Sequence, residues 1–153
     1  MPARLRPMIT ADLPACARIM AEDPLWQRYG ISHDNALQRI SAAFAEKAEF
    51  WVAEAEQVQG FIWFVLKGPF QHSGSILLIG VMPDAQNAGI GSQLMDVAES
   101  RLFETADDVQ LFVSDFNVGA QKLFRRRGYA QFAGLPSYVI SGVTELIYRK
   151  VKP

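Results

Sequence analysis

The sequence predicts a mixed α/β (α+β) fold, with a mostly antiparallel central sheet of about six to seven strands flanked by about four helices. Three observations support this prediction. The hydrophobic period changes from helical to strand-like near Phe50. Several strands then follow one another directly, which favours antiparallel pairing. A strand, a helix and a strand succeed each other over residues 75–113, which predicts one parallel pair joined by a right-handed crossover.

The first third of the chain is predicted to form a strand and two helices. Arg4–Ile9 is the expected first strand, and Thr10 is expected to cap the helix that follows. Apolar residues at helical spacing mark the buried face of that helix: Leu13, Cys16, Ala17 and Met20. A loop over Glu22–Ser32 leads to a second helix, which either Ser32 or Asp34 can cap.

The middle of the chain is predicted to form three strands and a third helix. Phe50–Ala55 and Val58–Leu66 are rich in β-branched and aromatic residues and are separated by a short turn. Ser75–Met82 is nearly continuously apolar, which is typical of a central strand buried on both faces. Pro83 ends this strand, and the third helix is expected to start at Gly89.

The last part of the chain is predicted to contain three strands and a fourth helix. Val109–Val113 forms the first of these strands, and Asn117 can cap the helix. Gly128 stands where a left-handed residue commonly ends a helix. Tyr129–Ala133 and Val139–Lys150 are the expected final strands.

Composition and length limit the classes of protein that this chain can be. Its 153 residues fit a single domain over 1–153, and the hydrophobic fraction of 50% indicates a globular protein. A net charge of -1 makes nucleic acid an unexpected partner. Cys16 is the only cysteine, so no internal disulfide can form. The N-terminus lacks an apolar signal core, and the longest apolar runs, Phe61–Leu66 and Ile76–Met82, are too short to span a membrane. We therefore expect a cytoplasmic protein without membrane partners.

The most informative segment is Val81–Ser92, which links the predicted central strand to the third helix. It consists mainly of small residues and exposes backbone N–H groups at a helix N-terminus, where phosphate oxygens bind readily. Gly89 and Gly91 allow close approach of a ligand to the backbone. The alternative is a tight turn whose glycines are needed only for steric reasons.

Two common phosphate-binding motifs do not fit this segment. A P-loop requires Lys and then Ser or Thr after its last glycine, whereas Ser92 and Gln93 follow Gly91. A dinucleotide-binding fingerprint requires a third glycine or alanine where this chain has Leu94. Its acidic residue belongs near the end of the next strand, but the aspartates here precede that strand.

A third pattern fits better, because two separate motifs of this chain resemble those of the GNAT acetyltransferase superfamily. The first resembles its acetyl-CoA signature and reads Val81-x-Pro83-x-x-Gln86-x-x-Gly89-x-Gly91. The second resembles its other CoA-side motif and reads Asn117-x-x-Ala120-x-x-Leu123-Phe124-x-x-x-Gly128-Tyr129. The predicted order of elements also matches that superfamily along nearly the whole chain.

The resemblance implies that acetyl-CoA is the co-substrate, with no metal. In this family the pyrophosphate lies over the first motif, and the pantetheine arm pairs with the central strand where that strand splays from its neighbour. A backbone N–H there polarises the thioester carbonyl. The residues implied to bind the cofactor are Ile79, Val81, Met82, Gln86, Asn87, Ala88, Gly89, Ile90, Gly91, Ser92, Asn117, Ala120 and Phe124.

The proton transfers are not assigned by the resemblance. The family commonly has Tyr as general acid where this chain has Phe124, and Ser114, Tyr129 or Tyr138 are candidate substitutes. The family often has a base on its fourth strand, but Ile76–Ile79 offers none. The candidates elsewhere are Glu22, Asp23, His33, Glu54 and His72, each of which also fits a solvated surface group. The catalytic residues therefore stay unknown at this stage.

The resemblance implies transfer of an acetyl group to the amine of a small molecule or peptide. Acceptor recognition is expected from Asp23–His33, which carries Trp26 and Tyr29, and from Gly134–Tyr138. Lys122 and Arg125–Arg127 fit either contacts with CoA phosphates or favourable charge at a helix C-terminus. A non-catalytic acyl-CoA-binding or regulatory domain is the alternative, and a homodimer is one option for the assembly.

Overall fold

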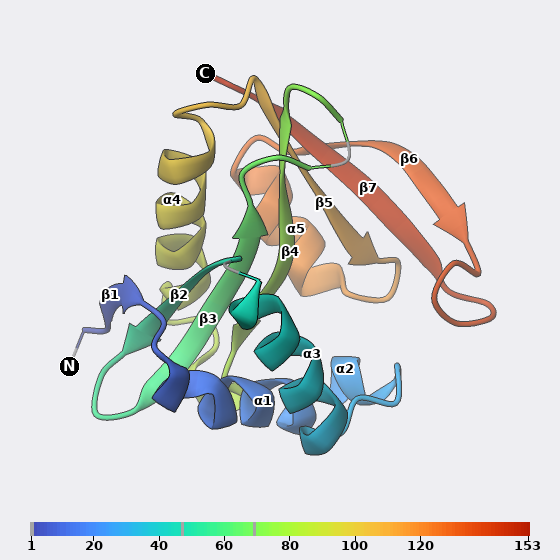
Figure 1. Ribbon diagram of the computed structural model, residues 1–153. Helices are drawn as coiled ribbons and strands as arrows, with labels where there is room; N and C mark the ends of the chain where they lie inside the picture. The colour runs from blue at the N-terminus through green and yellow to red at the C-terminus, as the bar shows by residue number, and fades with distance from the viewer. Residues whose placement is uncertain (1, 47, 69) are drawn as a thin grey trace. The chain divides into compact units, whose positions relative to one another are not determined.

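The computed structural model describes residues 2–46, 48–68 and 70–153 (Figure 1). Its strands are β1 Arg4–Pro7, β2 Glu49–Glu54, β3 Val58–Val65, β4 Ser73–Val81, β5 Asp108–Ser114, β6 Ala130–Pro136 and β7 Thr144–Val151. They form a seven-stranded sheet in the order β1-β2-β3-β4-β5-β7-β6. The β4–β5 pair is parallel, whereas β1–β2, β2–β3, β5–β7 and β6–β7 are antiparallel. The predicted fold class, with its one parallel crossover pair, is confirmed.

The described residues contain five α-helices, one more than the sequence predicts. They are α1 Leu13–Glu22, α2 Pro24–Gln27, α3 His33–Ala45, α4 Ile90–Leu102 and α5 Val118–Arg126. The additional helix, α2, is a single turn inside the segment expected to be a loop. Pro24 occupies its first turn, where the missing N–H costs nothing, and the N–H of Leu25 donates to the Asp23 carboxylate at 2.9 Å.

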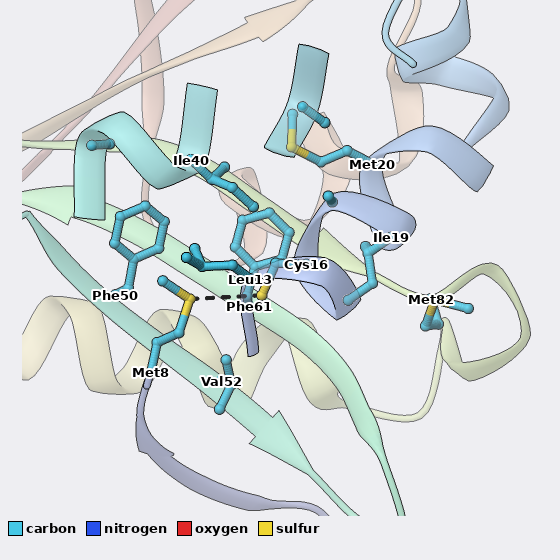
Figure 2. Packing of buried hydrophobic residues seen from close by; sticks show 13 residues of the cluster. Met8, Leu13, Cys16, Ile19, Met20, Ile40, Phe50, Val52, Phe61 and Met82 are labelled. Carbon is cyan, nitrogen blue, oxygen red and sulfur yellow. Dashed lines mark hydrogen bonds between the residues drawn. The ribbon is translucent and has the colours of Figure 1, made fainter. Parts of the chain in front are cut away.

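The chain divides into two compact units, the first of which comprises residues 1–64 and 78–98. Its hydrophobic core is formed by residues of α1, α3, β2 and β3, together with Met8 and Met82 (Figure 2). Cys16 is fully buried there, and its thiol lies 3.7 Å from the Met8 sulfur. The lone cysteine is therefore a core residue, in agreement with its place on the predicted apolar stripe.

The second unit comprises residues 65–77 and 99–153. Alternate residues of β5, namely Val109, Leu111 and Val113, are buried, as is Tyr148 of β7. Gly74 of β4 packs closely on α4, because a Cβ at this position would lie 2.5 Å from a methyl group of Leu102. The β6–β7 hairpin forms one edge of this unit (Figure 1).

The predicted helix caps are mostly confirmed. Ser32 caps α3 by accepting the Asn35 N–H at 3.2 Å, and Asp34 lies in the first turn instead. Asn117 caps α5 by accepting the Ala120 N–H at 3.1 Å. Gly128 follows α5 with a φ of 94°, a left-handed conformation that glycine adopts without strain.

The prediction that Thr10 caps the first helix is wrong. Residues Thr10–Asp12 form a 3-10 turn that precedes α1. The strand β1 ends at Pro7, two residues earlier than predicted. The Asp12 carboxylate organises this turn, because it accepts the Ile9 N–H at 2.9 Å and binds the guanidinium of Arg6. The ion pair between Arg6 of β1 and Asp12 within the turn thus takes the place of a local threonine cap.

The predicted start of the last strand is also wrong, because β7 begins at Thr144 rather than at Val139. Ser137 and Gly142 both have positive φ, at 52° and 82°, and enclose a turn that reverses the chain. The Gly142 N–H donates to the Ser137 hydroxyl at 3.0 Å. β6 is correspondingly longer than predicted and extends to Pro136.

Candidate functional site

The segment between β4 and α4 has the backbone shape of an anion-binding loop. A 3-10 turn, Pro83–Ala85, follows the strand, and α4 begins at Ile90. Between them Asn87 and Gly89 both adopt left-handed conformations, with φ of 65° and 84°. Turns of this kind point successive N–H groups to one side and form concave sites for anions. The glycine is needed here for its conformation, since a Cβ at residue 89 would meet nothing within 4 Å.

The loop is open to solvent on its outer side and fixed on its inner side. Gln86, Asn87 and Gly89 are exposed, whereas Ile90 is buried. The Gln86 side-chain amide donates to the Val81 carbonyl at 3.2 Å, which ties the loop back to the end of β4. The Gly89 carbonyl accepts the N–H of Gln93 at 3.1 Å, the first hydrogen bond of the helix. Hence Gln86 has a structural contact in addition to its predicted role at the pyrophosphate.

The end of β4 is packed closely against its neighbours in the first unit. The Met82 N–H donates to the Gln59 carbonyl at 2.8 Å, so this donor is already used within the protein. A Cβ on Gly80 would lie 2.7 Å from the Trp26 ring and 3.0 Å from the Phe61 ring. A Cβ on Gly60 of β3 would lie 3.0 Å from the Gly80 carbonyl and from Ile90. Glycines at residues 60 and 80 therefore allow α2 and α4 to approach these two strands.

The parallel pairing of β4 with β5 covers four residue pairs and ends with Ile76 and Leu111. The next residues of the two strands, Leu77 and Phe112, are 41% and 52% exposed. β5 itself continues in register with β7 to Ser114. Within the second unit, two large apolar side chains are thus accessible where the ladder stops.

Helix α5 of the second unit, with its N-cap, carries the remaining residues predicted to bind the cofactor, Asn117, Ala120 and Phe124. Asn117 is its N-cap, and Ala120 supplies the N–H that this cap accepts. Phe124 is buried, with ring centroids 6.0 Å from Tyr129 and 6.4 Å from Tyr148. The phenyl ring at the position where the family commonly has tyrosine is thus part of an aromatic cluster.

The candidate proton donors differ in their surroundings. Burial raises the pKa of Tyr129, and its hydroxyl donates to the Glu99 carboxylate at 3.2 Å, which disfavours release of that proton to a ligand. Ser114 is buried, and its carbonyl accepts the N–H of Asn117. Tyr138 is 63% exposed and stands edge-on to Phe112, with ring centroids 6.3 Å apart. Of these three, Tyr138 is the most accessible.

One tyrosine that the sequence analysis does not single out has unusual surroundings. Tyr148 is fully buried beside Phe124, and its hydroxyl has no hydrogen-bond partner among the residues that the structure describes. The Arg125 guanidinium lies 5.9 Å from the centre of the Tyr148 ring. No local sequence pattern reveals this, because Tyr148 reads as an ordinary residue of an alternating strand.

The candidate bases Glu54 and His72 have very different environments. Glu54 forms ion pairs with Arg6 at 2.8 Å and with Arg4 at 3.5 Å, and the hydrogen bond from Arg6 lowers the pKa of its carboxyl. These contacts weaken Glu54 as a proton acceptor. The side chain of His72 is 72% exposed, and its Nδ1 lies 4.0 Å from the Asp107 carboxylate. His72 precedes the first residue of β4, at the opposite end of that strand from Gln86.

The three remaining candidate bases have contacts in the first unit. Glu22 pairs with Arg18 at 2.9 Å, and Asp23 caps α2. The Nε2 atom of His33 lies 3.3 Å from the Pro14 carbonyl oxygen. None of these contacts singles out one residue as the base.

The predicted basic cluster is partly occupied by contacts within the second unit. Arg127 pairs with Glu99 at 3.0 Å, and Arg125 lies over an aromatic ring. Arg125 and Arg126 stand in the last turn of α5, where positive charge is favourable. Charge at a helix C-terminus thus accounts for Arg125 and Arg126, and an ion pair accounts for Arg127.

The described residues show neither a metal site nor a membrane-spanning helix. No group of three or more His, Cys, Asp or Glu side chains is arranged to hold a metal ion there. None of the helices in residues 2–46, 48–68 and 70–153 is long and apolar enough to cross a membrane.

Comparison with known proteins agrees with the family resemblance of the two sequence motifs. The profile of the acetyltransferase (GNAT) family matches residues 13–129. No curated protein sequence matches the chain. Among solved structures, Ard1 from Thermoplasma volcanium is 22% identical with a TM-score of 0.83, over 100% of this chain and 99% of that one.

Two other solved structures show the same fold. The ribosomal-protein-alanine N-acetyltransferase from Brucella melitensis is 22% identical with a TM-score of 0.79, over 97% of this chain and 99% of that one. YncA from Salmonella typhimurium, solved with its cofactor acetyl-CoA, is 15% identical with a TM-score of 0.76, over 99% of this chain and 94% of that one. The family profile and these folds together confirm the predicted resemblance.

Proposed function

Since the chain belongs to the GNAT acetyltransferase family, we propose that it transfers the acetyl group of acetyl-CoA to an amine by direct attack on the thioester. The observation that carries the proposal is the loop of Gln86–Ser92, where two left-handed residues precede an amphipathic helix. The amine nitrogen forms a bond to the carbonyl carbon, the C–S bond breaks, and CoA leaves as a thiolate. The proton lost from nitrogen passes to a base or to water.

The proposed cofactor contacts follow the predicted residues. In the first unit, the N–H groups of the loop and of the first turn of α4 hold the pyrophosphate. The backbone of Ile79–Met82 accepts the pantetheine arm and polarises the thioester carbonyl. Because the Met82 N–H already donates to the Gln59 carbonyl, the proposed donors to the thioester carbonyl are the N–H groups of Ile79–Val81. Asn117, Ala120 and Phe124 are the proposed contacts from α5.

The leaving thiolate does not require a strong acid. A thiol with a pKa of about 8.5 leaves as thiolate at pH 7 at a cost of roughly 2 kcal/mol. This cost is small compared with the barriers that enzymes overcome, so Phe124 in place of tyrosine is compatible with turnover. Tyr138, as the accessible candidate, is the proposed donor if one is used.

The amine presents the larger cost. An alkylamine with a pKa of about 10.4 loses its proton at pH 7 at a cost of roughly 4.6 kcal/mol. A carboxylate or imidazole acting through water can reduce this cost. Glu54 is held by two arginines, and His72 lies at the opposite end of β4 from the proposed thioester site. His33 and the carboxylates of Glu22 and Asp23 are therefore the better candidates.

The acceptor is proposed to be the amine of a small molecule or peptide that has an apolar portion. The α2 region presents Trp26 and Tyr29, and the β6–β7 connection presents Tyr138 at 63% exposure. Aromatic surfaces of this kind favour amphipathic ligands. We further propose that residues 1–153 act as a single acetyltransferase domain in the cytoplasm, with the assembly state open.

Release of free CoA thiol from acetyl-CoA, measured with a panel of amines and peptides, tests this function. The proposal expects amine-dependent thiol release that exceeds spontaneous hydrolysis. Tight binding of CoA without turnover on a broad panel would instead favour a non-catalytic acyl-CoA-binding domain. Phe124 and the lack of a carboxylate on Ile76–Ile79 are the observations that keep this alternative.

A further inference from the structure

Trp26 lies against the backbone of β4 at its carboxyl end. If residue 80 had a Cβ, that atom would lie 2.7 Å from Cη2 and 3.0 Å from Cζ3 of the indole, which is too close for any real side chain. The same indole packs on Phe61, with ring centroids 6.4 Å apart. Gly80 is thus the residue that allows the six-membered ring of Trp26 to reach the strand.

The position of Trp26 is well fixed. Its carbonyl accepts the N–H groups of Tyr29 at 2.9 Å and of Ile31 at 3.4 Å, so the chain after α2 folds back onto it. The start of α2 is fixed by Pro24 and by the Asp23 cap. The indole packs against the hydrophobic core of the first unit but stays partly accessible. It therefore forms a boundary between that core and the solvent beside β4.

The proposed function places the thioester of acetyl-CoA next to this boundary. If the backbone of Ile79–Met82 holds the thioester carbonyl, the acyl chain begins at that carbonyl, one or two residues from Gly80. An acetyl group adds a single methyl there, whereas a longer acyl group needs additional volume beside the strand. The Trp26 indole, in contact with Gly80, occupies volume of that kind.

We propose that Trp26 is a specificity-determining residue that restricts the acyl donor to acetyl-CoA by its contact with Gly80. This inference rests on the proposed function and adds the residue that selects the acyl chain. Enzymes discriminate between ligands that differ by one methylene by about 10- to 200-fold when a side chain bounds the pocket. Replacing the indole by a smaller side chain should reduce that discrimination.

The test compares Trp26→Leu and Trp26→Phe with the wild-type protein. Dissociation constants for CoA, acetyl-CoA and butyryl-CoA are measured by calorimetry, and kcat/KM is measured for both thioesters with an active amine. Trp63→Leu is the matched control, because Trp63 is also partly buried but stacks on Phe50 at 5.3 Å and under Arg39. Thermal unfolding checks that each variant is folded, and Trp26→Phe retains an aromatic ring if the leucine variant is unstable.

The expected result is that Trp26→Leu raises the ratio of butyryl-CoA to acetyl-CoA use by about 10-fold or more, with a smaller increase for Trp26→Phe. Trp63→Leu should leave the ratio as in the wild type. CoA binding with an unchanged acyl preference in both Trp26 variants would overturn this inference alone. Failure of the wild-type protein to bind CoA would overturn the proposed function, and this inference with it.

Discussion

Replacement of Glu99 by glutamine should destabilise the protein strongly. Glu99 is only 7% exposed, and its two carboxylate oxygens bind different cations of the second unit. Oε1 accepts from Lys150 at 2.6 Å, and Oε2 accepts from Arg127 at 3.0 Å and from the Tyr129 hydroxyl at 3.2 Å. Both cations are themselves largely buried, with side chains 18% and 16% exposed. An amide at residue 99 removes the negative charge that Lys150 and Arg127 share.

The size of the effect follows from this burial. Removing one partner of a buried ion pair typically costs about 3–5 kcal/mol, because the remaining charge stays desolvated and uncompensated. For a domain of this size each kcal/mol lowers the melting temperature by roughly 2–4 °C, so we expect a decrease of about 6–20 °C. Alanine at this position should cost at least as much, since it also removes the acceptor of the Tyr129 hydroxyl.

Urea unfolding followed by circular dichroism, with thermal melting alongside, measures this effect. Glu104→Gln is the matched control, because Glu104 is 60% exposed and pairs with Arg101 at 3.5 Å just beyond α4. An exposed pair of this kind contributes about 0–1 kcal/mol. Equal losses of stability in the two variants would show that burial does not make the Glu99 ion pairs more stabilising than an exposed pair.

Three further predictions concern other parts of the chain. The hydrogen bonds from Arg6 lower the pKa of Asp12. The ionised carboxyl therefore stabilises the folded protein at pH values above its unfolded pKa of about 3.9, and this stabilisation is lost as the pH falls through the lower pKa of the folded state. Urea unfolding from pH 6 to pH 2 should therefore show the difference between wild type and Asp12→Asn shrinking in acid, and a constant difference would contradict this. Burial raises the pKa of the Cys16 thiol to about 12, so iodoacetamide at pH 8 should label the urea-unfolded protein but not the native one, as mass spectrometry would show. Phe124→Tyr should raise the rate of thiol release or leave it unchanged, and a large loss would show that the aromatic packing of Phe124 is essential.

The parts of the fold that the sequence predicts correctly are those set by local chemistry. The caps at Ser32 and Asn117 and the left-handed Gly128 each depend on residues within one helical turn. The strand order along the chain follows from hydrophobic period and from turn residues. The loop of Gln86–Gly91 belongs to the same class, because its glycines and the helix start are adjacent in sequence.

The parts that sequence reasoning misses depend on residues distant in the chain. Thr10 loses its predicted role because Arg6, which also pairs with Glu54, binds the Asp12 carboxylate in an ion-pair network. The contact of Trp26 with Gly80 joins a one-turn helix to a strand, and no periodicity reveals it. The Tyr148 hydroxyl lacks a hydrogen-bond partner among the described residues, and this becomes visible only once the neighbouring strands and α5 are in place.

The proposed function requires that the loop after β4 holds the pyrophosphate of CoA. Calorimetric titration of the wild-type protein with CoA, pantetheine, ATP and NAD tests it most directly. We expect that CoA binds, that pantetheine binds far more weakly because it lacks the pyrophosphate, and that ATP and NAD do not compete effectively. Equal affinity for CoA and pantetheine, or a preference for ATP or NAD over CoA, would contradict it.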